Sequence, residues 1–330
     1  MAALLDVRGL KTTFTTDAGT FDAVDGVGFT LEPGKTLGLV GESGCGKSVT
    51  ALSIMGLIAP PAGRITAGEI LFEGTDLLRL PPAAMREVRG NRISMIFQEP
   101  MTSLNPAFTI GMQISEGILR HRKVSRAEAD RRAVDMLERV RMPVPARRFH
   151  EYPHQLSGGM RQRAMIAMAL ALEPRLLIAD EPTTALDVTI QAQILELMRA
   201  LRDETGTAII LITHDLGVIA ELAQEVAVMY AGRIVEVASV EALFADPQHP
   251  YTIGLLGSIP RLDIEQARLP AIEGQVPNPL DRPRGCRFAA RCPFATARCV
   301  AEDPPLEAVR PGHLAACWYA PLELKSEKAA

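Results

Sequence analysis

The sequence GESGCGKS at residues 41–48 decides the fold of this chain. It follows the apolar run Leu37–Val40, which predicts a buried strand, and precedes a segment with helical periodicity. Glycines let backbone N–H groups turn toward a phosphate oxygen, and a helix that begins near Lys47 directs its positive end at the same anion. Lys47 would reach the β- and γ-phosphates, and the hydroxyl of Ser48 would ligate Mg²⁺. The pattern therefore predicts a nucleoside triphosphate site made of Gly41, Glu42, Ser43, Gly44, Cys45, Gly46, Lys47, Ser48 and Val49.

The composition of the whole chain limits the alternatives. The 330 residues are 47% hydrophobic and 22% charged, and the formal net charge of -4 gives no basic field for nucleic acid. No apolar run approaches the roughly 20 residues of a membrane-spanning helix. The start, MAALLDVRGL, lacks the basic n-region and long apolar core of a secretory signal. We expect a cytosolic protein that reaches a membrane only through partners.

The apolar pattern predicts an α/β fold. Short continuous runs at Ile93–Phe97, Leu176–Ala179 and Ala208–Ile212 are typical of buried parallel strands. Apolar residues at helical spacing between 190 and 201 predict an amphipathic crossover helix, and strand, helix, strand in this order is a βαβ unit. Prolines recur after this core, so a domain boundary is predicted near 258–262.

Two carboxylates, Asp180 and Glu181, follow the run Leu176–Ala179. A strand that is buried along its length tolerates charge only at its end, next to a cation or a ligand. Asp180 is then placed to hold Mg²⁺ through water, and Glu181 to orient or deprotonate an attacking water. The alternative is an ordinary pair of solvated carboxylates at a strand end.

A second glycine-containing helix start occurs in QLSGGMRQR, residues 155–163. Ser157 can cap the helix, and Gly158 and Gly159 leave backbone N–H groups exposed at its beginning. One nucleotide does not need two phosphate cradles from one subunit. Two subunits facing head to tail could each complete the nucleotide site of the other. The alternative is a plain glycine turn before a helix.

These motifs together resemble the nucleotide-binding domain of an ABC transporter over residues 4–255. Residues 41–48 match the Walker A loop, and Leu156–Met160 matches the signature motif LSGGQ, with Met160 where the family usually has Gln. The resemblance implies a P-loop NTPase with a RecA-like core, an antiparallel β part and a helical subdomain at about 100–165. It implies that ATP, with Mg²⁺, is sandwiched between two such domains.

The resemblance also assigns roles to individual residues. It implies that Glu181 is the catalytic carboxylate and that His214, in LITHD, is the switch histidine that contacts the γ-phosphate. It implies that Gln98 is the Q-loop glutamine, which ligates Mg²⁺ and faces the membrane partner, and that Asp180 ends the Walker B strand. It also implies that Asp187 is the D-loop aspartate and that Phe14 stacks on adenine, with Phe21 competing for that role.

Longer stretches resemble the ATPases of dipeptide, oligopeptide and nickel permeases, and extend the match to about 4–320. They are FQEPMTSLNP, YPHQLSGGM, DEPTTALDVTIQAQIL, HPYTIGLL and the tail GCRFAARCPFATARC. The resemblance implies a nucleotide-binding domain at 1–258 and a C-terminal extension at 259–330. It implies the ATPase of a bacterial importer for peptides or a related small solute, peripheral at the cytoplasmic face of the inner membrane. Implied partners are a paralogous ATPase in a heterodimer, two transmembrane permease subunits and, indirectly, an extracytoplasmic binding protein, but no nucleic acid.

Two functions of other classes compete with transport. A soluble ABC ATPase of translation or repair usually carries tandem cassettes or a long coiled-coil insertion, and neither is visible here. A regulatory metal-sensing module that no longer hydrolyses ATP is disfavoured because Glu181 and His214 are both present.

Four of the five cysteines follow residue 285 with the spacing C-x5-C-x6-C-x17-C: Cys286, Cys292, Cys299 and Cys317. In a cytosolic chain such a group indicates a metal or cluster site rather than disulfides. The spacing lacks a CxxC pair, so it is a poor match to a zinc ribbon. Four thiolates can hold zinc or an iron–sulfur cluster. The family resemblance favours a 4Fe–4S cluster, with zinc as the alternative ion, His313 as an alternative ligand, and four unligated thiols as the remaining possibility.

Overall fold

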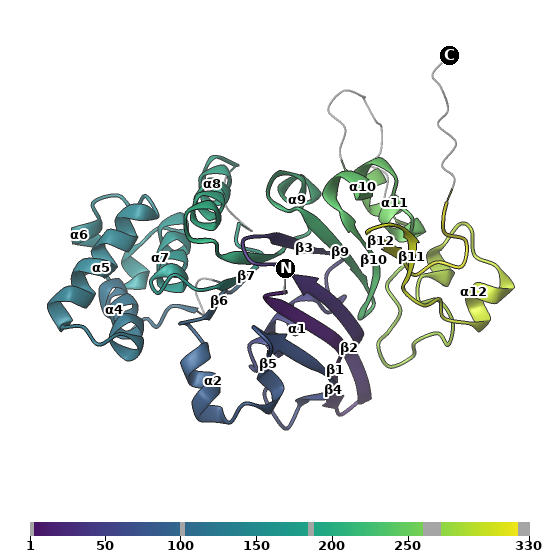
Figure 1. Ribbon diagram of the computed structural model, residues 1–330, viewed down its shortest axis with the longest axis horizontal. Helices are drawn as coiled ribbons and strands as arrows, with labels where there is room; N and C mark the ends of the chain where they lie inside the picture. Colours follow the sequence, from purple (N-terminus) through teal and green to yellow (C-terminus); the bar gives the residue numbers. More distant parts are fainter. Residues whose placement is uncertain (1–2, 100–102, 184–187, 260–271, 323–330) are drawn as a thin grey trace, which may run out of the picture. The chain divides into compact units, whose positions relative to one another are not determined.

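The computed structural model describes residues 3–99, 103–183, 188–259 and 272–322, and its helices and strands are labelled in Figure 1. The chain divides into two compact units, each assembled from separate stretches of sequence. The first unit comprises Met1–Leu5, Leu31–Thr36 and Phe72–Ile212, and the second unit comprises Asp6–Thr30, Leu37–Leu71 and Thr213–Ala330.

The first unit is built on three parallel strands, β6 (Ile93–Ile96), β7 (Leu176–Asp180) and β8 (Ala208–Ile212). Strand β7 pairs with both of the others, and Ile178 lies opposite Met95 in the register with β6. Every residue of the three strands is buried. Burial on both faces explains why these strands are continuous apolar runs rather than alternating ones.

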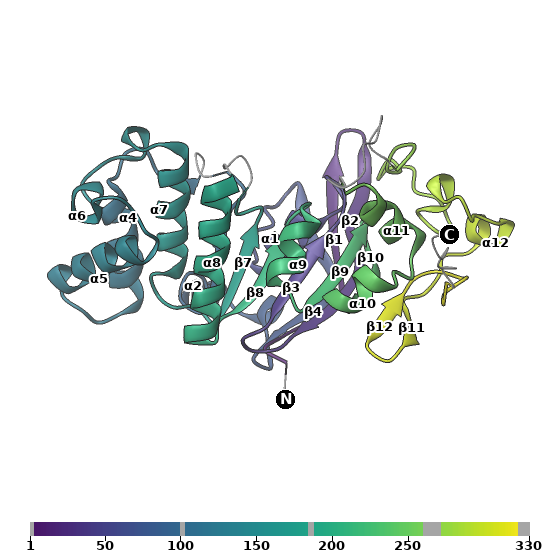
Figure 2. The ribbon, with the colours of Figure 1, turned by 90° about the horizontal axis from the view of Figure 1, so that it is seen from above.

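The helices of the first unit lie mostly in the chain between β6 and β7. Figure 2 shows them grouped beside α8, the crossover helix that leads from β7 to β8. Besides β6, β7 and β8, the elements of this unit are β5 (Thr75–Asp76), η1 (Leu77–Arg79), α2 (Pro82–Val88), α4 (Ile110–His121), α5 (Arg126–Arg139), α6 (Pro145–Arg148), η2 (Pro153–Gln155), α7 (Gly158–Leu170) and α8 (Val188–Thr205).

A buried arginine holds this helical group together. Arg163, on α7, is 7% exposed. It donates hydrogen bonds to the carbonyl of Val140, just after α5, at 2.7 Å and to the side chain of Gln193, on α8, at 2.6 Å. A charged group that is buried with its donors satisfied fixes the relative positions of its partners.

The second unit contains an antiparallel sheet and a pair of parallel strands. Strands β2 (Gly19–Leu31), β1 (Leu5–Thr16) and β4 (Gly63–Phe72) are neighbours in that order. Strand β3 (Thr36–Val40) is parallel to β9 (Glu225–Tyr230). The helices of this unit are α1 (Lys47–Ile54), α9 (Leu216–Leu222), α10 (Val240–Ala245), α11 (Pro250–Gly257), η3 (Ala289–Arg291) and α12 (Ala297–Ala301).

The C-terminal segment, residues 272–322, adds strands to the sheet that contains β3. Strand β10 (Arg233–Ser239) is antiparallel to β9, β12 (His313–Ala315) is antiparallel to β10, and β11 (Glu307–Arg310) is antiparallel to β12. In Figure 1 these two last strands are yellow and lie beside the green β10. The C-terminal segment is therefore joined to the rest of the second unit by backbone pairing.

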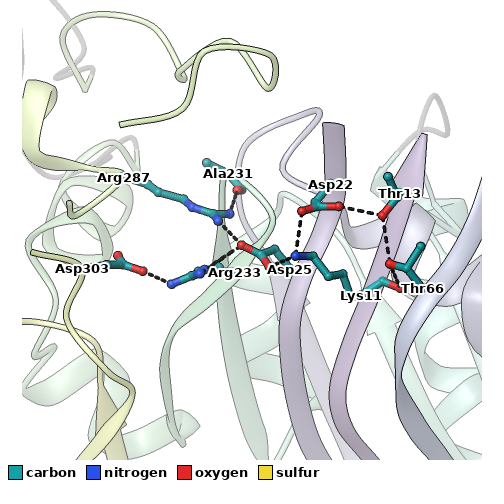
Figure 3. A network of polar contacts seen from close by, with 9 residues as sticks. All are labelled: Lys11, Thr13, Asp22, Asp25, Thr66, Ala231, Arg233, Arg287 and Asp303. Atoms are coloured by element: carbon teal, nitrogen blue, oxygen red, sulfur yellow. Dashed lines mark hydrogen bonds and ion pairs between the residues drawn. The ribbon is translucent and has the colours of Figure 1, made fainter. Parts of the chain in front are cut away.

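A network of charged side chains also anchors this segment to the first strands of the chain (Figure 3). Asp25, on β2, accepts hydrogen bonds from Arg233, at 3.0 Å, and from Arg287. Arg287 donates to the carbonyl of Ala231 at 2.6 Å, and Arg233 also forms an ion pair with Asp303. Burial opposes ionisation of Asp25, but the two guanidinium groups prevail and lower its pKa to about 2.

No helix among the described residues has both the length and the apolar character needed to cross a membrane.

Candidate functional site

The phosphate loop has the geometry that its sequence predicts, with β3 before it and α1 beginning at Lys47. Gly41 has a φ of 147°, and a Cβ placed there would lie 2.1 Å from the carbonyl oxygen of Met229. Gly46 has a φ of 108°, and a Cβ there would lie 2.7 Å from the carbonyl oxygen of Ala23. Both positions thus require glycine for backbone conformation and for space.

The start of α1 has the features of an anion-binding helix terminus. Its N-cap, Gly46, offers no side-chain acceptor, and its first turn has no acidic residue. Lys47 is 6% exposed, and its Nζ donates to the carbonyls of Gly41, at 2.7 Å, and Glu42, at 3.0 Å. Amides at a helix start and a lysine beside them attract phosphate oxygens. Burial raises the pKa of Cys45, against the opposing charge of Lys47, so this buried thiol stays neutral.

The two candidates for the adenine contact, Phe14 and Phe21, lie together. They come from the neighbouring strands β1 and β2, and their rings are stacked with centroids 6.1 Å apart and an interplanar angle of 22°. Both rings are half-buried. An aromatic ring that is partly exposed can still stack on a base.

In the first unit, Asp180 and Glu181 occupy the end of β7. Asp180 is 4% exposed, whereas Glu181 is half-buried and has a left-handed backbone with φ 48°. The amide of Glu181 donates to the carbonyl of Ile212 at 2.8 Å. The side chain of Gln98 donates from Nε2 to Oε2 of Glu181 at 3.2 Å. The structure therefore brings the predicted Q-loop glutamine to the predicted catalytic carboxylate.

The signature segment begins α7. Ser157 is the N-cap, and its hydroxyl accepts a hydrogen bond from the amide of Met160 at 3.4 Å. Gly158 is exposed, and a Cβ placed there would meet no atom within 4 Å. A Cβ at Gly159 would meet only Ile190, at 3.8 Å, and neither glycine has a left-handed backbone. The chain's own packing does not require glycine at these two positions.

The sequence analysis did not single out Gln162, on α7. It is 3% exposed, and its Nε2 donates a hydrogen bond to the carbonyl of Pro182, directly after Glu181. Helix α7 is thereby tied to the segment that carries Glu181, the predicted catalytic carboxylate. The sequence offered little signal, because Gln162 lies between Arg161 and Arg163, before the apolar run of residues 164–170.

His214 is exposed, and the residue after it, Asp215, is the N-cap of α9. The carboxylate of Asp215 accepts hydrogen bonds from the amides of Gly217 and Val218, at 2.8 and 3.3 Å. The cap fixes the turn that carries His214 and leaves the imidazole at the surface.

The predicted site residues are distributed over both units. The second unit holds Phe14, residues 41–49 and His214, and the first unit holds Gln98, Ser157, Gly158, Gly159, Asp180 and Glu181. Asp187 lies outside the described residues.

The prediction of a 4Fe–4S cluster, with zinc as the alternative, is wrong. The four C-terminal cysteines line one cavity of about 20 Å³, yet no group of three or more His, Cys, Asp or Glu side chains is placed to hold a metal ion in the part of the chain that the structure describes. Burial raises the pKa of Cys286 to about 11 and also raises the pKa of Cys292 and Cys317. Metals bind thiolates, so an environment that keeps thiols protonated opposes ligation. His313 is bound elsewhere, because its Nε2 lies 2.7 Å from the buried Glu236 carboxylate.

Comparison with known proteins identifies the family. Residues 24–184 match the family model for ABC transporters, and residues 235–299 match the C-terminal region of oligopeptide/dipeptide transporters. The chain is 58% identical over 316 residues to a protein of Sinorhizobium fredii named "Probable peptide ABC transporter ATP-binding protein", covering 96% of this chain and 94% of that one. This chain belongs to the ATP-binding subunits of ABC transporters.

Further relatives agree with this assignment. The ABC subunit is 53% identical over 318 residues to the dipeptide transport ATP-binding protein DppD of Bacillus subtilis, covering 96% of this chain and 95% of that one. Two solved structures of MJ0796 each cover 72% of this chain and 98% of their own, with a TM-score of 0.65. One, at 26% identity, is a dimeric bacterial ABC transporter cassette, and the other, at 25%, is a dimeric post-hydrolysis state bound to ADP and Pi. The predicted α/β ABC fold is confirmed, and the chain is an ABC ATPase whose nucleotide is ATP.

Proposed function

We propose that this ABC ATPase powers the uptake of peptides through a bacterial membrane importer. The observation that carries the proposal is that one chain joins the ABC transporter region, 24–184, to the C-terminal region of oligopeptide/dipeptide transporters, 235–299. The names of its relatives in Sinorhizobium fredii and Bacillus subtilis support peptides as the cargo. In this proposal residues 1–258 are the nucleotide-binding domain, with a helical subdomain at about 100–165, and residues 259–330 are the extension.

The phosphate loop would bind the nucleotide. The loop amides of residues 41–49 and the Lys47 ammonium would hold the phosphates, while Phe14, stacked on Phe21, would contact the adenine. The residues that would hold Mg²⁺ are Ser48, Gln98 and, through water, Asp180. Their hydroxyl, amide and carboxylate oxygens are the donor set that this cation prefers. When bound, Mg²⁺ would neutralise charge on the phosphates.

Hydrolysis would depend on Glu181, His214 and Gln98. Glu181 would orient the attacking water and accept its proton, and His214 would donate a hydrogen bond to the γ-phosphate. The hydrogen bond between Gln98 and Glu181 supports a shared role, because it limits the directions in which the carboxylate can point. Asp187 would complete the set as the D-loop residue.

The signature segment would serve the nucleotide of a second subunit. Gly158 and Gly159 have space around them in this chain, so a close approach from outside explains their lack of side chains. The dimeric cassettes of MJ0796 support such an arrangement. Because ATP binds better to the closed pair, it would shift the population toward closure, and hydrolysis would reverse the shift.

The remaining partners follow from the same proposal. ABC cassettes of peptide importers work with transmembrane permeases, and we extend this to a paralogous second ATPase, two permease subunits and an extracytoplasmic binding protein. The chain would then lie at the cytoplasmic face of the inner membrane, held there by the permeases through the region around Gln98 and the helices α4 and α5.

The test is reconstitution of the complete complex in lipid vesicles with its binding protein. We expect ATP hydrolysis to be stimulated several-fold by a cognate dipeptide or oligopeptide and peptide to accumulate in the lumen. Stimulation by nickel or glutathione but not by any peptide would show that the cargo is that solute and not a peptide. ATPase activity that is independent of the permeases but stimulated by RNA or DNA would instead support a role in translation or repair.

A further inference from the structure

An ion pair links the phosphate loop to the C-terminal segment. Nη1 of Arg291 donates to Oε2 of Glu42 at 2.7 Å, and Nη2 donates to Oε1 at 2.9 Å. The side chain of Arg291 is 4% exposed and that of Glu42 is 30% exposed. Two parallel hydrogen bonds between a guanidinium and a carboxylate fix their orientation as well as their distance. Glu42 is the second residue of the phosphate loop, so its side chain is held by a residue 249 positions away.

Arg291 is itself held in one position. It donates to the carbonyls of Glu273, at 2.9 Å, and Ile272, at 3.1 Å, and to the hydroxyl of Tyr230, at 3.3 Å. The hydrogen bonds to Glu42 raise the pKa of Arg291 further above its ordinary value, against the effect of burial, so the guanidinium stays charged. The guanidinium of Arg291 is therefore held in place from several sides. Arg291 is the last residue of η3, in the C-terminal segment.

The backbone of Glu42 is fixed as well. Its amide donates to the hydroxyl of the fully buried Tyr251 at 2.8 Å, and its carbonyl accepts from Nζ of Lys47 at 3.0 Å. Together with the Arg291 contact, the amide, carbonyl and carboxylate of Glu42 are each bound to a different side chain. One of these three, Lys47, is the residue that would meet the phosphates.

We propose that Arg291 is a positioning residue for the nucleotide, acting through Glu42. By holding Glu42 it keeps the phosphate loop in the shape that receives the phosphates, so the C-terminal segment takes part in ATP binding. Without Arg291 the loop loses this support, and the carboxylate of Glu42 stays uncompensated beside an anionic ligand. The inference rests on the proposed function, because it assumes that the loop binds ATP.

Other contacts attach the C-terminal segment to the rest of the chain, so the role of Arg291 can be distinguished from simple attachment. Arg287, with Asp25, already joins the C-terminal segment to β2, and β12 pairs with β10. The segment therefore keeps its main attachments when Arg291 is replaced. What Arg291 adds is the contact with the phosphate loop.

The test measures ATP affinity of the full-length chain by calorimetry. We expect Arg291→Ala to weaken ATP binding roughly tenfold, in the range of ordinary coupling between sites. Arg291→Lys keeps the charge but cannot form the two-pronged contact, so it should weaken binding by several-fold. The double variant Arg291→Ala/Glu42→Ala should bind no more weakly than the worse single variant, because residues that act through one contact are not additive.

A matched control lies in the same segment. Arg298 stacks on Trp318, with its guanidinium carbon 3.6 Å from the ring centroid, and pairs with the exposed Glu302. Arg298→Ala removes a guanidinium without touching the phosphate loop and should leave ATP affinity unchanged. Hydrogen exchange provides the readout that a merely structural role would not give. In Arg291→Ala the amides of residues 41–46 should exchange faster, while those of β12 stay as in the wild type.

The inference is overturned by wild-type ATP affinity in both Arg291 variants, or by effects of Arg291→Ala and Glu42→Ala that simply add. If Arg291→Ala does not fold, Arg291→Lys decides alone. Lys47→Ala separates this failure from failure of the proposed function. Loss of ATP binding in Lys47→Ala with normal binding in the Arg291 variants refutes only the positioning role, whereas normal binding in Lys47→Ala refutes the phosphate site itself.

Discussion

The side chain of Gln98 donates a hydrogen bond to the carboxylate of Glu181 at 3.2 Å, across 83 positions of sequence. Glu181 adopts a left-handed backbone, with φ 48°, directly after the buried Asp180. Such a conformation costs on the order of 1–3 kcal/mol for a residue other than glycine and persists where the surroundings fix it. The carboxylate is therefore held in place from its backbone and from its side chain, as expected of a group that orients a reactant.

Glu181→Gln should abolish ATP turnover and leave ATP binding intact. The amide keeps an oxygen that can accept from Gln98, so the local geometry survives, but it cannot accept a proton from water. Loss of a general base typically lowers the rate by about 10²–10⁴-fold. Phosphate release by the reconstituted complex, compared with ATP binding by calorimetry, measures the two effects. Hydrolysis at the wild-type rate would refute the assignment of Glu181.

Gln98→Glu should move the acid limb of the pH–rate profile to higher pH. A second carboxylate beside Glu181 disfavours ionisation of the pair, which raises the pKa of the group that must be ionised to act as a base. We expect a shift of about one pH unit. Gln98→Met is the control, because it removes the hydrogen bond without adding charge. It should lower the rate and move the acid limb less than Gln98→Glu does, because it removes one hydrogen bond donated to the carboxylate but adds no like charge. An unmoved limb in Gln98→Glu would contradict the contact.

Lys47→Ala should lose most of its affinity for ATP. The ammonium lies at the start of α1 and donates within its own loop, to the carbonyls of Gly41 and Glu42 and to Sγ of Cys45, so it can turn to the stronger phosphate acceptors. We expect binding to weaken by roughly two orders of magnitude, since each lost charge-assisted contact is worth about 1.5–3 kcal/mol. Calorimetry on the full-length chain measures this effect. Unchanged affinity would mean that the loop is not the phosphate cradle.

Gly158→Ala should leave the isolated chain stable and impair its ATP-dependent association. The added methyl group meets open space in this chain, so the melting temperature should change little. A partner subunit that approaches this face would collide with it. Gly117→Ala, in α4 and equally unhindered, is the matched control and should affect neither property adversely. Association by light scattering with Glu181→Gln as background measures the effect, and normal association would argue against the composite site.

His249 should make the protein less stable as the pH falls below neutrality. Burial lowers the pKa of His249 from its ordinary value of 6.5 to about 3. Between these two pH values the unfolded chain binds a proton at His249 and the folded chain does not. The free energy of unfolding is therefore unaffected by His249 above pH 6.5 and decreases as the pH falls from 6.5 toward 3. The slope is at most about 1.4 kcal/mol per pH unit.

His249→Asn tests this, because asparagine can still accept the N-cap hydrogen bond from the amide of Tyr251. Thermal unfolding at pH 7.5, 6.5 and 5.5 should show a shallower decline in the variant than in the wild type. The exposed His154→Asn serves as the control and should retain the wild-type slope. Parallel declines in all three proteins would show that His249 does not titrate as inferred.

Local features of the sequence predicted the elements that carry the site. The strand predicted at Ala208–Ile212 has those bounds in the structure, and the helix predicted between 190 and 201 lies within α8. The run at Ile93–Phe97 is one residue longer than β6. These predictions succeed because burial on both faces and amphipathic periodicity are properties of neighbouring residues.

Prediction failed where the environment of a side chain mattered. The cysteine spacing identified four thiols that do line one cavity, but it gave no information on their pKa or on the directions of their side chains. Gln162 was missed for a similar reason, since its partner, the carbonyl of Pro182, is 20 positions away.

The sequence by itself determined the phosphate loop, because the backbone conformations of Gly41 and Gly46 and the start of α1 are local properties of GESGCGKS. Only the tertiary structure decided which distant groups act on that chemistry. Arg291 meets Glu42 and Gln98 meets Glu181 because strands and turns far apart in the chain end at the same place. Such contacts depend on distances between side chains, which no spacing along the chain specifies.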